Sequence, residues 1–110
     1  MGRGERARAP LYSPRQAVVV FKRAITAEGR VIVSHHFRQA MVDATDPFAM
    51  EDVLSVRAQG AIGRPPEQDV RTGEWAYRVV GPDCAGRALA VIFVPLGPNA
   101  IKLVTGFHTR

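Results

Sequence analysis

The chain has 110 residues, enough for one domain and too few for two independent hydrophobic cores. Its apolar fraction of 46% argues against a disordered chain, and no apolar run approaches the roughly eighteen residues that a membrane-spanning helix requires. The formal net charge of +5 favours acidic partners such as RNA, DNA or an acidic protein, because a positive field concentrates polyanions near the surface.

The N-terminal segment 1–11 is rich in glycine, arginine and proline and has no periodicity. We therefore expect a flexible basic arm, followed by a single domain over residues 12–110. No apolar stretch directly follows the arginines, so this segment is not expected to be a secretory signal. Cys84 is the single cysteine, which excludes an intrachain disulfide and fits a reducing, cytoplasmic location.

Three helices and an intervening strand are predicted in the first half of the chain. Ser13 is a suitable N-cap before Pro14, and Ser34 can cap a second helix in the same way. Asp46 before Pro47 repeats the signal of a cap followed by proline. The expected elements are a helix over 14–28, a strand or extended lead-in over 30–33, a helix over 35–43 and a helix over 47–59.

The second half of the chain has the pattern of a β-meander. Residues 61–69 contain a proline pair and are expected to be a weak strand or a loop. Better strands are predicted over 74–80, 87–94 and 100–107. Their connectors are short, which forces antiparallel neighbours, and the strand over 87–94 is apolar on both faces and should be central. The predicted fold class is α+β, with N-terminal helices packed on an antiparallel sheet.

Several segments of the chain are similar to a known bacterial domain family of unknown function. Tyr12 and Ser13 open the first helix, and SHHFRQAM (34–41) is similar to the Ser-x-His motif that begins the family's second helix. MEDVLSVRAQGAI (50–62) looks like its third helix, and GRALAVIFV (86–94) with IKLVTGF (101–107) looks like its closing strands. The same layout resembles the MqsR toxins and, more distantly, the RelE-like and BrnT-like toxins. The resemblance implies a curved antiparallel sheet covered by helices, and cleavage of mRNA.

The resemblance directs attention to three candidate catalytic residues. Cleavage through the ribose 2′-hydroxyl requires a group that takes its proton and cations that neutralise the phosphate, but no cofactor. His36 falls on the motif histidine and could act as base or acid, while Arg78 and Lys102 could hold phosphate charge. The alternatives are a helix-capping role for His36 and ordinary surface roles for the two cations. Ala40 stands where the family often has an arginine, which removes one cation.

Three further residues are candidates for RNA binding: Arg38, Tyr77 and His108. Tyr77 could stack on a base together with Trp75, although a lone tryptophan beside a central apolar strand is more often part of the core. His108 could donate a proton, although it is expected at a mobile, solvated end. Period-2 alternation predicts two faces for the last strand, with Lys102, Val104 and Gly106 on one and Ile101, Leu103, Thr105 and Phe107 on the other.

Other chemistries find little support in the residue spacing. The histidines and Cys84 form no metal-ligand pattern, and Cys84 lies in a predicted turn without a paired histidine. The acids near the third helix are expected to be caps or part of a solvated face: Asp43, Asp46, Glu51 and Asp52.

The sequence therefore favours a toxin of a type II toxin–antitoxin system that cleaves mRNA without a metal ion or cofactor. Its expected partners are RNA and a cognate antitoxin protein. The alternatives are a non-catalytic RNA- or protein-binding module with the same fold, and an interaction domain whose basic arm docks on an acidic partner.

Overall fold

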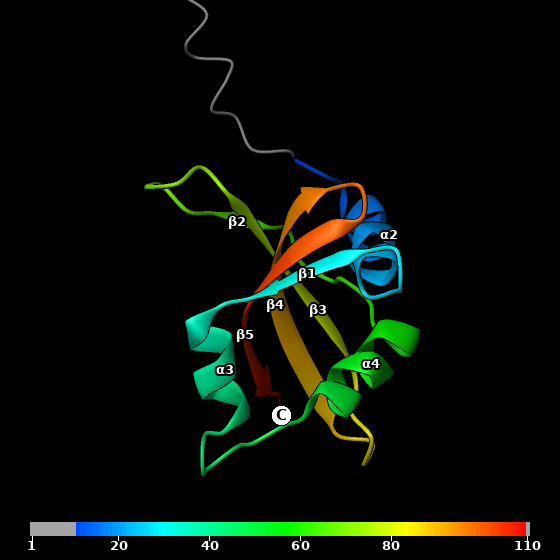
Figure 1. Cartoon of the computed structure of the whole chain (residues 1–110), viewed down its shortest axis with the longest axis vertical. Helices are drawn as coiled ribbons and strands as arrows, with labels where there is room; N and C mark the ends of the chain where they lie inside the picture. Colours follow the sequence, from blue (N-terminus) through cyan, green and yellow to red (C-terminus); the bar gives the residue numbers. More distant parts are fainter. Residues whose placement is uncertain (1–10, 110) are drawn as a thin grey trace, which may run out of the picture.

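The computed structural model describes residues 11–109, and in this range it contains three helices and five strands (Figure 1). In chain order they are α2 (Pro14–Ala24), β1 (Arg30–Val33), α3 (His35–Met41), α4 (Met50–Gln59), β2 (Glu67–Gln68), β3 (Trp75–Pro82), β4 (Ala88–Gly97) and β5 (Ala100–His108). The fold is α+β, as predicted. Nearly all of the basic arm expected over 1–11 lies outside the described residues. None of the described helices is long and apolar enough to cross a membrane.

The five strands form one open sheet in the order β1-β5-β4-β3-β2. The predicted meander of β3, β4 and β5 is confirmed, with antiparallel pairing throughout. The prediction of a wholly antiparallel sheet is wrong at one edge, because β1 runs parallel to β5, with Arg30 opposite Ala100. No short connector joins these two strands, so the constraint that makes the meander antiparallel does not act on them.

A capping box fixes the start of α2, and a tight turn follows its end. The Ser13 hydroxyl accepts from the backbone N–H of Gln16 at 3.1 Å, and the Gln16 side chain accepts from the Ser13 N–H at 2.9 Å. The helix ends at Ala24, four residues before the predicted Glu28. Gly29 folds back against the helix end so closely that a Cβ atom there would lie 2.3 Å from the Ala24 carbonyl oxygen. A side chain at this position would clash with the helix end, so the turn that follows α2 requires a glycine there.

The other two helices begin at different kinds of cap. For α3, the predicted cap is confirmed, because the Ser34 hydroxyl accepts from the Phe37 N–H at 3.0 Å. For α4, the predicted start at Pro47 is wrong, because the helix begins at Met50 and Asp52 accepts from the Ala49 N–H at 2.9 Å. Asp46 does not cap this helix; its carboxylate binds a residue at the far end of the chain.

Helices α2 and α4 pack on one face of the sheet and form the hydrophobic core with it (Figure 1). The predicted central position of β4 is confirmed, because its inward side chains are fully buried. Phe93 of β4 packs against Phe21 of α2, with ring centres 4.9 Å apart, and against Tyr77 of β3 at 5.8 Å. The shorter α3 lies alongside β5, beyond the end of β1, where the Ser34 hydroxyl donates to the Val104 carbonyl at 3.0 Å.

A β-bulge in β5 changes which side chains reach each face of the sheet. Leu103 pairs with Phe93 and Thr105 pairs with Ile92, so Val104 is an extra residue without a partner on β4. The predicted alternation is therefore wrong beyond Val104, since one inserted residue reverses the orientation of all that follow. Thr105 and Phe107 lie on the same face as Lys102, whereas Gly106 and His108 lie on the face covered by helices.

Candidate functional site

The sheet face opposite α2 and α4 carries Arg78, Lys102, Thr105 and Phe107, and we call it the open face. Pairing places its members together, because residues directly opposite on neighbouring strands share a face. Arg78 of β3 is opposite Ile92 of β4, which is opposite Thr105 of β5, and Phe107 follows two residues later on the same face. On the other side of β3, Glu67 of β2 is opposite Ala76, which shares the face of Arg78.

Arg78 and Phe107 form the centre of the open face. The Arg78 guanidinium carbon lies 5.2 Å from the centre of the Phe107 ring, a cation–π contact. Phe107 is 38% exposed, which is high for a phenylalanine. Among residues 11–109 the Arg78 guanidinium has no carboxylate partner, so its position is set by the ring while its N–H donors stay free for a ligand.

A first hollow of about 350 Å³ opens between α3 and β5, beside Phe107. His36, Gln39 and Ala40 line it from α3, where they are at helical spacing, and Asp43 lines it from the turn after the helix. Asp46, Thr105, Gly106 and Phe107 complete the lining. His36 is exposed and its ring makes no hydrogen bond within the described chain, so its ring nitrogens are open to a ligand.

A second hollow of about 220 Å³ lies on the other side of Phe107. Arg64, Pro65 and Glu67 form its rim, and Arg78, Ile92 and Phe107 lie on the sheet beneath, with Ala76 and Tyr77. Phe107 borders both hollows, so they are neighbours across one exposed aromatic ring. His36 and Arg78, predicted from separate segments, are thereby brought to the same surface.

The remaining predicted residues are less central to this surface. Lys102 shares the open face, but its ammonium lies 2.9 Å from the Glu74 carboxylate, so its charge is largely neutralised. Arg38 is exposed on α3, yet it does not line either hollow, because it lies about 200° around the helix from His36.

Tyr77 is not positioned to stack on a base, because its side chain is fully buried. Its hydroxyl donates to the Tyr12 carbonyl at 2.5 Å and accepts from the Tyr12 N–H at 2.7 Å. Burial raises the pKa of this phenol, although the hydrogen bond to Tyr12 opposes the shift. Tyr77 belongs to the hydrophobic core, and Trp75, for which a core position was the stated alternative, packs partly buried against the same cluster.

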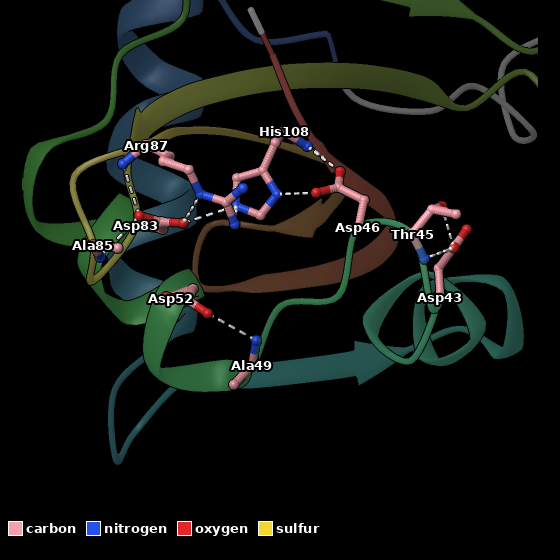
Figure 2. A network of polar contacts seen from close by, with 9 residues as sticks. All are labelled: Asp43, Thr45, Asp46, Ala49, Asp52, Asp83, Ala85, Arg87 and His108. Atoms are coloured by element: carbon pink, nitrogen blue, oxygen red, sulfur yellow. Dashed lines mark hydrogen bonds and ion pairs between the residues drawn. The ribbon is translucent and has the colours of Figure 1, made fainter.

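His108 occupies a different environment from the one predicted for it. It was expected at a solvated end, but its side chain is only 8% exposed and lies between two carboxylates (Figure 2). Its Nε2 atom is 2.7 Å from Asp83, and its Nδ1 atom contacts Asp46, which also accepts from the His108 backbone N–H at 2.8 Å. Arg87 lies beside the ring, with its Nε atom 3.6 Å from Asp83.

The electrostatics of this cluster favour ionised aspartates. The His108 backbone N–H donates to Asp46 and, against the opposing effect of desolvation, lowers the pKa of that carboxyl. Burial alone would raise the pKa of Asp83, but hydrogen bonds from Arg87 and His108 outweigh it and the pKa is lowered. Asp46 and Asp83 contact the two ring nitrogens of His108, and the Arg87 guanidinium lies 3.2 Å from Nε2. The cluster therefore ties the end of β5 to the β3–β4 turn and to the loop before α4.

The described residues show no arrangement that would hold a metal ion. The two ring nitrogens of His108 face different carboxylates, and no group of three or more His, Cys, Asp or Glu side chains in residues 11–109 converges on one point. Cys84 is exposed, but desolvation and the hydrogen bond with Asp52 raise its pKa, which disfavours the thiolate that a nucleophile needs.

Comparison with known proteins adds no assignment. No protein-family model, curated protein or solved structure matches the chain significantly. The function is therefore inferred from the residues of the open face and the hollows beside it.

Proposed function

We propose that this protein is a metal-independent endoribonuclease of the RelE/MqsR-like class, the toxin of a type II toxin–antitoxin pair, which binds single-stranded RNA across the open face. The observation that carries the proposal is the Arg78 guanidinium held over the exposed Phe107 ring, next to a hollow with an unpartnered His36. The resemblance of the SHHFRQAM segment to the Ser-x-His motif supports the toxin class.

The open face offers the two interactions that single-stranded RNA uses most. An exposed aromatic ring accepts a stacked base of any type, and Phe107 is such a ring. Arginine binds a phosphate through paired N–H donors, and both Arg78 and Arg64 border the second hollow. A strand laid across Phe107 would thus meet cations on one side and His36 on the other.

The charges that line the two hollows favour different parts of the RNA substrate. Asp43 and Asp46 line the first hollow with His36 and would repel a phosphate placed deep within it. The scissile phosphate is therefore best placed toward Arg78, with the ribose 2′-hydroxyl toward His36. Neutral His36 takes the 2′ proton, the 2′-oxygen attacks phosphorus, and the 5′-oxygen leaves with a proton from solvent. The products are a 2′,3′-cyclic phosphate and a 5′-hydroxyl end.

A non-catalytic RNA-binding module is the second candidate, and specific observations favour it. Lys102, which was predicted to assist catalysis, is paired with Glu74, and Ala40 lines the first hollow where the related family often has arginine. Of the three residues predicted to take part in catalysis, His36 is then the one left to transfer a proton.

Cleavage of a defined RNA by the purified protein in EDTA, with both new ends mapped, tests the proposal. We expect fragments with cyclic phosphate and 5′-hydroxyl ends, lost in His36→Ala and retained in His35→Ala. His35 is the matched control, because it is the adjacent exposed histidine and does not line either hollow. RNA left intact by the native protein, both alone and with added ribosomes, would reject the nuclease; salt-sensitive binding without cleavage would establish the second candidate.

A further inference from the structure

The second hollow contains a carboxylate that the proposed cleavage does not use. Glu67 lies on the two-residue strand β2 and pairs with Ala76, which places it on the open face. It lines the hollow together with Arg64, Arg78 and Phe107. An acid at a surface that binds a polyanion weakens phosphate binding, so its position there calls for a different role.

Glu67 differs from the other acids of the sheet and its turns. Asp69 caps a turn by accepting from Arg71, Glu74 pairs with Lys102, and Asp83 binds His108. Within residues 11–109, the Glu67 carboxylate has no hydrogen bond or ion pair, although two arginines border the same hollow. Its four lone-pair sites are therefore open to a ligand.

A carboxylate beside a stacking ring selects a base by its donors. An ionised carboxylate can only accept hydrogen bonds. Guanine presents two adjacent donors on its Watson–Crick edge, N1–H and the N2 amino group, whereas the same edge of adenine, cytosine or uracil places acceptors beside a single donor group. Two parallel N–H···O bonds to Glu67 are thus possible with guanine and with no other standard base.

We propose that the second hollow is a guanine-binding subsite, in which the base stacks on Phe107 or the Arg78 guanidinium and donates N1–H and N2–H to Glu67. This inference rests on the proposed RNA-binding function of the open face. It makes Glu67 a specificity residue that reads one nucleotide near the scissile phosphate, without taking part in the chemical step.

The test compares affinities for short fluorescent 2′-O-methyl oligonucleotides, which lack the nucleophile and stay intact. An oligouridine is measured beside versions that carry one central guanosine, adenosine or cytidine. We expect guanosine to tighten binding by about tenfold, the size of one good bidentate contact, and the other bases to change it little. In Glu67→Gln the guanosine advantage should disappear, because an amide offers one acceptor and one donor group.

Glu51→Gln is the matched control, because it removes the same charge from an exposed position on α4; the guanosine advantage should survive in it. Circular dichroism would verify that both variants are folded. Equal affinity for all four bases, or a guanosine advantage that persists in Glu67→Gln, would overturn the subsite while leaving RNA binding intact. Failure to bind even oligouridine at low salt would instead refute the proposed function, and the subsite with it.

Discussion

At the scale of single residues, the clearest contrast is between two histidines. His36 is exposed beside the first hollow and makes no hydrogen bond within residues 11–109. His108 is nearly buried, and both of its ring nitrogens contact carboxylates. A group that exchanges protons with a substrate has to be accessible, which His36 is; His108 instead links three segments of the chain.

The cluster around His108 leads to a prediction about pH. Asp46 and Asp83 have pKa values below the ordinary 3.8, so the unfolded chain takes up protons before the folded one as the pH falls. The stabilisation is therefore complete well above pH 3.8 and is lost as the pH drops below it. Urea unfolding at a series of pH values should show a falling free energy of unfolding in this acid range.

Asp83→Asn is expected to lower stability at neutral pH and to flatten this acid dependence, since the amide keeps the shape but not the charge. Glu51 is an exposed residue of α4 outside the cluster, so Glu51→Gln should leave the pH profile unchanged. If Asp83→Asn retained the full profile of the native protein, the cluster would not be the source of the acid sensitivity.

At the scale of elements, local signals were predictable from sequence and long-range pairing was not. Ser13 and Ser34 cap their helices as expected, because the cap and its partner are three residues apart. The parallel pairing of β1 was missed, because no local pattern states which strand will be its neighbour. Asp46 was misassigned for the same reason, since its partner His108 is 62 residues away.

The residues of the candidate site show the same contrast between local signals and long-range pairing. His36 and Arg78 were identified from a motif and from residue type, without knowledge of their neighbours. Phe107 was assigned to the wrong face, because the Val104 bulge reverses the alternation and depends on the register with β4. Glu67 could not be singled out, because the hollow that it lines is formed with residues from three other strands or loops.

Close packing between α4 and β3 leads to a prediction at this scale. A Cβ atom on Gly81 would lie 2.9 Å from the Cα atom of Gly60, a backbone atom that cannot move aside cheaply. We expect Gly81→Ala to lower the free energy of unfolding by roughly 1–3 kcal/mol, measured by chemical denaturation.

Gly97→Ala is the control for added bulk, because no heavy atom lies within 4 Å of the added carbon. It should change the free energy of unfolding by less than about 0.5 kcal/mol. Equal destabilisation by the two substitutions would mean that the cost at Gly81 does not come from the close approach of Gly60 and α4.

At the scale of the whole molecule, the sheet separates two kinds of surface. One face is joined to α2 and α4 through the apolar core. The open face carries the cations Arg64 and Arg78, which have no carboxylate partner within the described chain, beside an exposed aromatic ring. The proposed binding of RNA therefore depends less on the net charge of +5 than on where the cations lie.

The salt dependence of RNA binding measures this distribution. Each phosphate that a cation neutralises contributes about 0.7 to the slope of log affinity against log salt for a single strand. We expect Arg78→Ala to reduce the magnitude of this slope by about 0.7, measured by fluorescence anisotropy with an oligouridine. The control is Arg15→Ala. Arg15 is an exposed residue of α2 that lines neither hollow, so its loss should leave the slope unaltered. Equal losses in the two variants would indicate diffuse attraction rather than a defined interface.

The parallel pairing of β1 with β5 also affects the order in which the chain folds during its synthesis. Ser34, at the end of β1, bonds to Val104 across 70 residues of chain. At the usual rate of synthesis, about 5–20 residues per second, the ribosome needs roughly 4–14 seconds to add that stretch. Throughout this interval the β-branched segment Val31–Val33 has no strand to pair with, a state in which strands join the wrong partner or a chaperone. Strand β1 therefore reaches its final pairing only after β5 has left the ribosome.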